Sequence, residues 1–180
     1  MPFLIISATR AEAAHVPRGL PVVVTGLGKT AAAVATAQAL GAADRNGLTV
    51  VNIGTAGALR DGVSGIQLPG TVLNHDINAD VIRALGYDPE EVLTVTGDTR
   101  TVLATGDVFV TEPEVRTALA ARAHLVDMEG YAVAYACKRF GVPVHLVKHV
   151  SDNADETALS WPEMVELSAR ALGDWLAANL

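Results

Sequence analysis

Short apolar runs alternate with Ala-rich segments along the whole chain, and this alternation limits the possible folds more than any other feature. The runs are rich in Val, Leu and Ile, as strands buried on both faces are. The segments between them are dominated by residues that favour helices, chiefly Ala, Leu and Gln. Strands and helices in this order predict an α/β fold, with three α/β/α layers around a mixed, largely parallel, twisted sheet. We expect residues 1–180 to form a single domain.

The pattern assigns residues to elements as follows. The expected strands are residues 3–7, 21–25, 48–53, 70–74, 101–105, 124–127 and 142–150. The expected helices are residues 29–43, 113–123, 128–140 and a last one opening at Ser160-Trp161-Pro162-Glu163, a capping-box pattern with Pro in the first turn. The pattern is weakest over residues 76–98, where Tyr87-Asp88-Pro89-Glu90-Glu91 is predicted to be an exposed loop.

Composition excludes several classes of protein. The chain has 13 Lys and Arg against 20 Asp and Glu, a formal net charge of −7, and its basic residues are scattered. A duplex-binding surface needs a basic stripe, so no nucleic-acid partner is expected. Because 50% of the residues are apolar and 18% are charged, the chain is not disordered. The small polar share also indicates that part of the surface is buried in an oligomer.

The sequence predicts no metal, cofactor or membrane partner. Cys137 is the single cysteine, which excludes an internal disulfide and a paired-cysteine metal site, and it is predicted to pack inside a helix. His145 and His149 would lie roughly 13 Å apart on a strand at ~3.3 Å per residue, too far to share an ion. Neither a signal peptide nor an apolar run near the ~18 residues of a membrane span is visible. A cytoplasmic location is therefore expected.

A glycine-rich turn, Gly26-Leu27-Gly28-Lys29-Thr30, joins an expected strand to a helix. It resembles the end of a phosphate-binding P-loop, but the first glycine of that motif would fall at Val23. A dinucleotide fingerprint would need a third glycine where Ala31 stands. We therefore interpret the segment as a tight turn between a strand and a helix.

Candidate chemistry lies at the strand ends, where open α/β sheets bind ligands. The small residues of Gly54-Thr55-Ala56-Gly57 would let a ligand approach the backbone, although another turn fits equally well. Asp127-Met128-Glu129 can cap a helix or accept hydrogen bonds from a sugar diol. Asp152 follows the strand at 142–150 and is either a proton donor or a turn residue. Glu12, after the first strand, would by itself be a surface residue.

Four segments together carry a resemblance to a known family. They are Val51-Asn52-Ile53-Gly54-Thr55-Ala56-Gly57-Ala58-Leu59, Thr105-Gly106-Asp107-Val108-Phe109, Val126-Asp127-Met128-Glu129-Gly130, and Gly141-Val142-Pro143 through to Lys148-His149-Val150-Ser151-Asp152-Asn153-Ala154-Asp155. In order and spacing they resemble the nucleoside phosphorylase/nucleosidase family, and within it most of all the methylthioadenosine/S-adenosylhomocysteine nucleosidases. The resemblance extends from Phe3 to the final helix and implies that family's fold.

The resemblance implies a small-molecule purine nucleoside substrate whose N-glycosidic bond is hydrolysed. By position, Asp152 would protonate or hydrogen-bond N7 of the purine, and Glu12 would activate the attacking water. Glu129 would bind the ribose hydroxyls. The other binding residues implied are Met128 against the ribose, Phe109 stacked on the base, the Val110 backbone at the base edge, Ser151 beside the acid, and Thr55, Ala56, Gly57, Asp127 and Lys148.

The nucleophile and the oligomeric state follow from the same resemblance. Related phosphorylases carry an Arg at the position of Asn52 to hold phosphate, and an amide does not replace that charge. Water is therefore the expected nucleophile. Arg10 is another residue able to hold phosphate, so a phosphorylase remains an alternative function. Residues 12–26 and 87–106 are shorter stretches than typical family members have, so a nucleoside-binding module without catalysis is a second alternative. The nucleosidases that this chain resembles are homodimers in which the partner helps to close the active site, so a homodimer is expected.

Overall fold

A computed structural model describes residues 2–180, apart from the side chain of Thr157. Its elements in chain order are β1 (Phe3–Ser7), β2 (Val22–Val24), α1 (Lys29–Ala42), β3 (Thr49–Ala58), β4 (Ile66–Gln67), β5 (Pro69–Asn74), α2 (Ala79–Ala84), β6 (Val92–Thr94), β7 (Asp98–Thr105), α3 (Pro113–Ala120), β8 (Leu125–Asp127), α4 (Gly130–Phe140), β9 (Val144–Asp152), the 3-10 helix η1 (Glu156–Ser160) and α5 (Trp161–Asn179).

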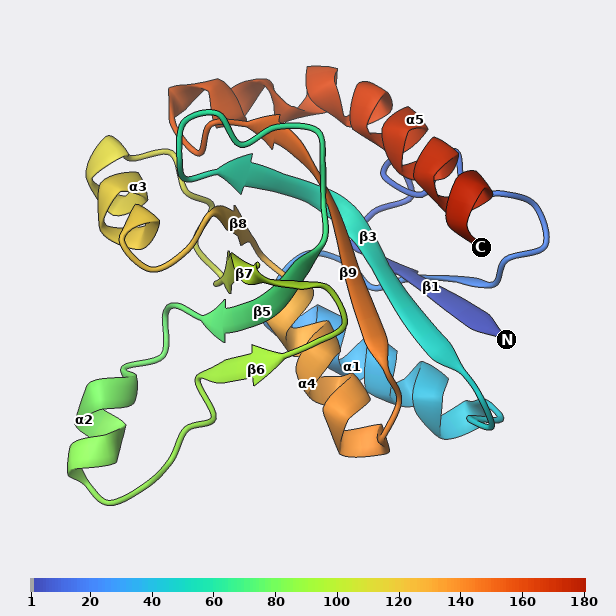
Figure 1. Cartoon of the computed structure of the whole chain (residues 1–180), viewed down its shortest axis with the longest axis horizontal. Coiled ribbons are helices and arrows are strands. Elements are labelled where there is room, and N and C mark those ends of the chain that lie inside the picture. The colour runs from blue at the N-terminus through green and yellow to red at the C-terminus, as the bar shows by residue number, and fades with distance from the viewer. Residues whose placement is uncertain (1) are drawn as a thin grey trace.

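The strands form one mixed sheet at the centre of the molecule. Its order is β2-β1-β3-β8-β7-β5-β6, with β9 paired to β3 and β4 paired to β9. Five of the pairings are parallel, and those of β3 with β8, β4 with β9 and β5 with β6 are antiparallel. Helices α1 and α4 cover one face, and α5 crosses the other (Figure 1). The predicted three-layer, largely parallel architecture is thus confirmed.

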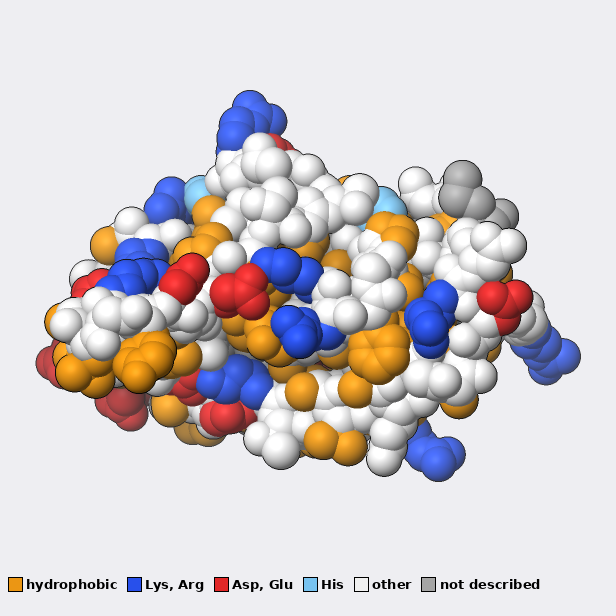
Figure 2. Space-filling view, turned by 90° about the horizontal axis from the view of Figure 1, so that it is seen from below, with side chains coloured by type: hydrophobic (Ala, Val, Ile, Leu, Met, Phe, Trp, Pro, Cys, Tyr) orange, Lys and Arg blue, Asp and Glu red, His pale blue; other side chains and the backbone are white. Residues whose placement is uncertain are grey.

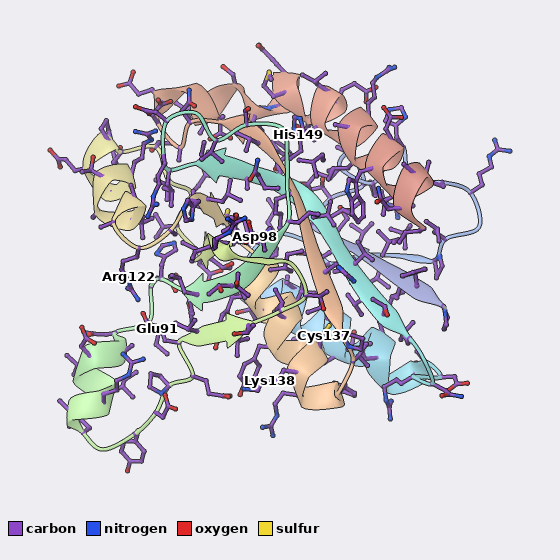
Figure 3. All side chains as sticks on the ribbon, in the orientation of Figure 1. Glu91, Asp98, Arg122, Cys137, Lys138 and His149 are labelled. Carbon is purple, nitrogen blue, oxygen red and sulfur yellow. The ribbon has the colours of Figure 1, made fainter. Side chains whose placement is uncertain are left out.

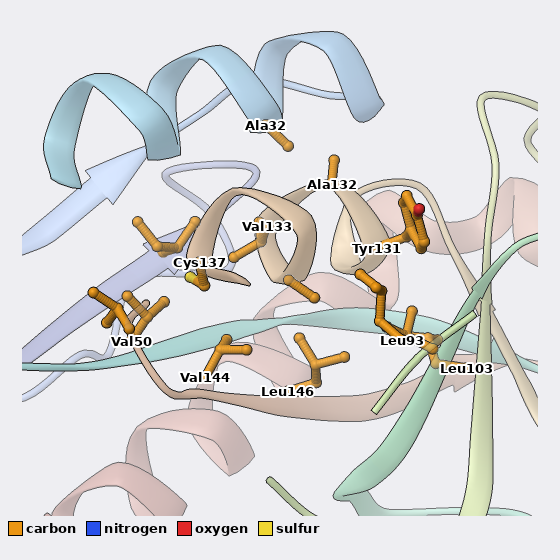
Figure 4. Close-up of a cluster of buried hydrophobic side chains, with 14 of the residues drawn as sticks. Ala32, Val50, Leu93, Leu103, Tyr131, Ala132, Val133, Cys137, Val144 and Leu146 are labelled. Carbon is orange, nitrogen blue, oxygen red and sulfur yellow. The ribbon is translucent and has the colours of Figure 1, made fainter. Parts of the chain in front are cut away.

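The main core lies between α4 and the sheet. Val133 and Cys137 of α4 are fully buried, in one cluster with Val50 and Val144 of the strands below (Figure 4). The outer side of α4 meets α1 through small side chains, including Ala32, which lets the two helices pack closely. Cys137 is fully buried, which confirms that this cysteine is a packed side chain, and the burial raises the pKa of its thiol to about 12.

Residues 76–98 differ from the sequence prediction. They contain α2 and β6, which were missed because elements of six and three residues give almost no periodic signal. Residues 87–91 form a loop, as predicted, but the expectation that Glu91 is exposed there is wrong. Glu91 is only 6% exposed and pairs with Arg83 and with Arg122, which is labelled beside it in Figure 3. Burial alone would raise the pKa of Glu91, but the two guanidinium groups hold it below its usual value.

Two further predictions need correction. Gly54-Thr55-Ala56-Gly57 is not a turn, because β3 runs on to Ala58 and pairs with β9 along this whole segment. The capping box at the start of α5 does not form, and in the described part of the chain Ser160 makes no side-chain cap bond. Its backbone (φ −85°, ψ 9°) continues from η1 instead of entering the helix from an extended conformation.

The surface mixes charged and apolar side chains. On the face shown in Figure 2, Lys and Arg side chains stand singly or in small groups between acidic and apolar ones. None of the helices that the structure describes is both long and apolar enough to cross a membrane.

Candidate active site

One pocket opens where β1, β8 and β9 end beside the last part of β3. This is the edge at which the strand ends predicted a ligand. The structure brings nearly all of the predicted site residues together there, and Lys148 is the one that does not line the pocket. Those that do are Glu12, Thr55, Ala56, Gly57, Phe109, Val110, Asp127, Met128, Glu129, Ser151 and Asp152.

Glu12 is held firmly at the pocket, although it lies in a loop. Its Oε1 atom accepts hydrogen bonds from the backbone N and from Oγ1 of Thr55, both at 2.9 Å. Its Oε2 atom accepts from the backbone N (3.1 Å) and from Oγ1 (2.9 Å) of Thr9. These four hydrogen bonds fix the orientation of the carboxylate. Glu12 is only 4% exposed, and it is one of the residues that line the pocket.

Asp152 is placed by an irregularity in the sheet. Ala56 pairs with Val150, but Gly57 pairs with Asp152, so β9 has one extra residue at this point. Such a bulge redirects the side chains that follow it. Oδ1 of Asp152 accepts from the backbone N of Ala154 at 2.8 Å, and Oδ2 accepts from Oγ of Ser151 at 2.6 Å.

Gly57 is needed for this placement because the two strands approach closely. A Cβ atom at Gly57 would lie 2.9 Å from Oδ1 of Asp152 and 2.9 Å from Cβ of Ala154. A larger residue would therefore push Asp152 out of the pocket.

Glu129 lies at the junction of β8 and α4 and is only 8% exposed. Its Oε1 atom accepts a hydrogen bond from the backbone N of Gly28 at 2.8 Å. Gly28 has a φ of +90°, so the glycine-rich turn before α1 is shaped to bring this N–H to the carboxylate. Burial and the neighbouring charge of Asp127 raise the pKa of Glu129 to about 7.

Asp127 and Lys148 form a buried ion pair beneath the pocket. Nζ of Lys148 lies 2.9 Å from Oδ2 of Asp127, which also accepts from the backbone N of Gly130 at 2.9 Å. The hydroxyl of Thr105 donates to the other oxygen of Asp127. Lys148 therefore supports the pocket from below instead of facing it.

The segment that carries Phe109 is anchored by the start of α1. The backbone N of Lys29 donates to Oδ1 of Asp107 at 2.7 Å, and its Nζ bonds Oδ1 of Asn74 at 2.8 Å and pairs with Asp76. Asp76 in turn accepts from the backbone N of Asp107 at 2.8 Å. Phe109 itself is 47% exposed.

Several pocket residues were not predicted as site residues. They are Ala8, Leu27, Val108, Val126, Ala158 and Trp161. Trp161 was expected only as part of the segment that opens the last helix, yet its Nε1 donates to Oγ1 of Thr55 at 2.8 Å. Leu27 lies in the glycine-rich turn that joins a strand to a helix, and its place at a strand end is the sequence signal that points to the pocket.

The fold and the pocket define a class, the α/β/α proteins with a nucleoside phosphorylase-like sheet and a ligand pocket at its strand ends. The sequence profile of the phosphorylase superfamily matches residues 18–177. The chain belongs to this superfamily.

The chain is similar to several nucleosidases, which are N-glycosyl hydrolases. It is 42% identical over 78 residues to an aminodeoxyfutalosine nucleosidase of Helicobacter pylori, a match that spans 42% of this chain and 34% of that protein. It is 28% identical over 168 residues to a 5'-methylthioadenosine/S-adenosylhomocysteine nucleosidase of Shewanella denitrificans, spanning 76% of this chain and 70% of that protein. These matches thus cover only part of their length, one third of it in the first case.

Solved structures agree on the fold. The crystal structure of the H. pylori 5'-methylthioadenosine/S-adenosylhomocysteine nucleosidase with butyl-thio-DADMe-Immucillin-A superposes with a TM-score of 0.85. The two chains are 25% identical, and the superposition covers 98% of this chain and 96% of the other.

Proposed function

We propose that the protein hydrolyses the N-glycosidic bond of a purine nucleoside and releases the free base. The observation that carries this proposal is the meeting of three carboxyl groups, those of Glu12, Glu129 and Asp152, in one pocket with the aromatic ring of Phe109. They come from separate parts of the sequence and reach the pocket on different elements. The naming of the relatives as nucleosidases supports the same reaction class.

Cleavage of an N-glycosidic bond places positive charge on the sugar and negative charge on the leaving base. Glycoside hydrolysis meets a similar transition state with two carboxyl groups, one on each side of the bond. Here Asp152 donates a proton or hydrogen bond to the base, and Glu12 takes the proton of the attacking water. Glu129 binds the ribose hydroxyls between them. Each acid–base role is typically worth ~10²–10⁴-fold in rate.

Water fits the pocket better than phosphate as the nucleophile. Asn52 is buried, and its Nδ2 donates to the carbonyl of Ile6 at 3.1 Å. Asn52 therefore supplies no charge to hold phosphate, and the pocket-lining residues of the described chain include no Lys or Arg that could take that role. Arg10, the residue that keeps phosphorolysis open, is exposed and does not line the pocket.

The substrates to test are methylthioadenosine, S-adenosylhomocysteine, aminodeoxyfutalosine, adenosine and inosine. We expect free base from at least one of them, at equal rates with and without phosphate. Glu12→Gln is the control for a contaminating activity, because it removes the carboxylate that activates water but keeps the shape of the side chain. Release only with phosphate, together with ribose 1-phosphate, would show a phosphorylase. Tight binding by calorimetry without any release would show a binding module.

We also propose that two copies of the chain associate and cover the pocket. The support is that apolar side chains of the pocket wall face outward, with Leu27 64% exposed, Val108 54% and Phe109 47%. A partner that covered them would remove apolar surface from water. Solution scattering at micromolar concentration should give the mass of a dimer, and the mass of a monomer would contradict this.

A further inference from the structure

Trp161 and Glu12 are connected through the side chain of Thr55. Nε1 of Trp161 lies 2.8 Å from Oγ1 of Thr55, and that oxygen lies 2.9 Å from Oε1 of Glu12. The three residues come from the start of α5, from β3 and from the loop after β1. All three line the candidate active site.

The chemistry of the groups fixes the direction of both hydrogen bonds. An indole N–H can only donate, and a threonine hydroxyl has a single hydrogen. Because the Thr55 oxygen accepts the hydrogen of Trp161, its own hydrogen is directed at Glu12. The other carboxylate oxygen is oriented locally, since Oγ1 of Thr9 accepts from the backbone N of Glu12 at 3.2 Å and donates to Oε2.

We propose that Trp161 is a positioning residue, which orients Glu12 for the attack of water through the hydroxyl of Thr55. This inference rests on the proposed hydrolytic function. Without the indole donor, the Thr55 hydroxyl can rotate and donate elsewhere, and Glu12 keeps only the backbone bond of Thr55 on that oxygen. The aromatic ring and the N–H of Trp161 therefore have separable roles, one in the pocket wall and one in this hydrogen-bond chain.

The substitution that separates these roles is Trp161→Phe, which keeps an aromatic wall and removes the N–H. We expect kcat to fall about tenfold with KM nearly unchanged, because the lost interaction orients the carboxylate of Glu12 and leaves the contacts with the nucleoside in place. Trp175→Phe is the matched control, since Trp175 lies on the same helix outside the pocket, and its kcat should stay at the wild-type value.

A double-mutant cycle tests whether the effect passes through Thr55. Thr55→Val removes the hydroxyl and keeps the shape of the side chain. If Trp161 acts through that hydroxyl, Trp161→Phe should cost nothing further in the Thr55→Val background. Equal losses of kcat in both backgrounds would overturn the inference, as would a wild-type kcat in Trp161→Phe.

A readout independent of turnover is the indole N–H resonance of Trp161, assigned by its loss in Trp161→Phe. It should shift in Thr55→Val and also in Glu12→Gln, which changes the acceptor at the far end of the chain. A resonance that ignores both substitutions would overturn the inference even if the enzyme is active. Failure of the wild-type protein to release base from any nucleoside would instead overturn the proposed function, and the positioning role with it.

Discussion

Nζ of Lys148 lies 2.9 Å from Oδ2 of Asp127, and the two side chains are only 2% and 1% exposed. Burial alone would lower the pKa of Lys148, but the charges of Asp127 and Glu129 outweigh it and raise that pKa. The lysine therefore stays protonated beneath the pocket. It joins the middle of β9 to the end of β8, the two strands that deliver Asp152 and Glu129.

Lys148→Met should destabilise the protein strongly. Removal of one partner leaves Asp127 as an unpaired buried charge, which typically costs about 3–5 kcal/mol. Addition of Asp127→Asn should recover part of this loss, because it removes the charge that Lys148 had neutralised. Urea unfolding measures both changes. Lys138→Met is the matched control, since Lys138 is 55% exposed and its pair with Glu90 should be worth less than about 1 kcal/mol. An equal loss in the two single variants would contradict the buried pair.

Glu129 should make stability fall as pH rises between about 4.5 and 7. Its pKa is about 7 in the folded protein and 4.5 as an ordinary glutamate, so within this window the folded state keeps a proton that the unfolded state has lost. The stabilisation is complete below this range and is lost as pH rises through the folded pKa. The free energy of unfolding of Glu129→Gln, relative to that of the wild type, should therefore be about 2–3 kcal/mol higher at pH 8 than at pH 5.

Unfolding curves at the two pH values measure this difference. Glu163→Gln serves as the control for the loss of a glutamate, because Glu163 is exposed on α5. Parallel pH profiles for the wild type and Glu129→Gln would contradict the raised pKa of Glu129.

The sequence predicted the long elements and the place of the site, because both depend on local patterns. Buried strands and Ala-rich helices repeat regularly, and the acids Glu129 and Asp152 stand where strands end. The resemblance added Glu12, which local pattern alone left on the surface. Its burial results from Thr9 and Thr55, and Thr55 is distant in the sequence.

The rest depends on contacts that no local pattern encodes. Lys148 was expected to touch substrate, but its direction is set by Asp127 on a neighbouring element. Trp161 was expected only to open the last helix, since nothing in the local sequence reveals that its N–H reaches Thr55. Glu91 was placed in an exposed loop because its partners Arg83 and Arg122 lie on other segments.

Lys29→Met should weaken nucleoside binding more than it slows the chemical step. Nζ of Lys29 pairs with Asp76 and lies 3.8 Å from Oδ2 of Asp107, and Asp107 begins the segment that carries Phe109. Loss of the ammonium leaves two acids facing each other, so the segment moves and KM should rise about tenfold, with a smaller change in kcat. Steady-state kinetics test this, with Lys138→Met expected to match the wild type. A lower kcat at unchanged KM would contradict a role in binding.

Asp152→Asn should lower kcat at least ~10²-fold, because the amide cannot supply an acidic proton to the leaving base. The fold should persist, since the remaining carbonyl oxygen can still accept from the backbone N of Ala154. KM should change little, because the shape of the side chain is kept. Asp174→Asn, at an exposed position of α5, is the control for a simple loss of charge. Wild-type turnover in Asp152→Asn would mean that Asp152 only forms the turn after β9, and the proton would have to come from elsewhere in the pocket.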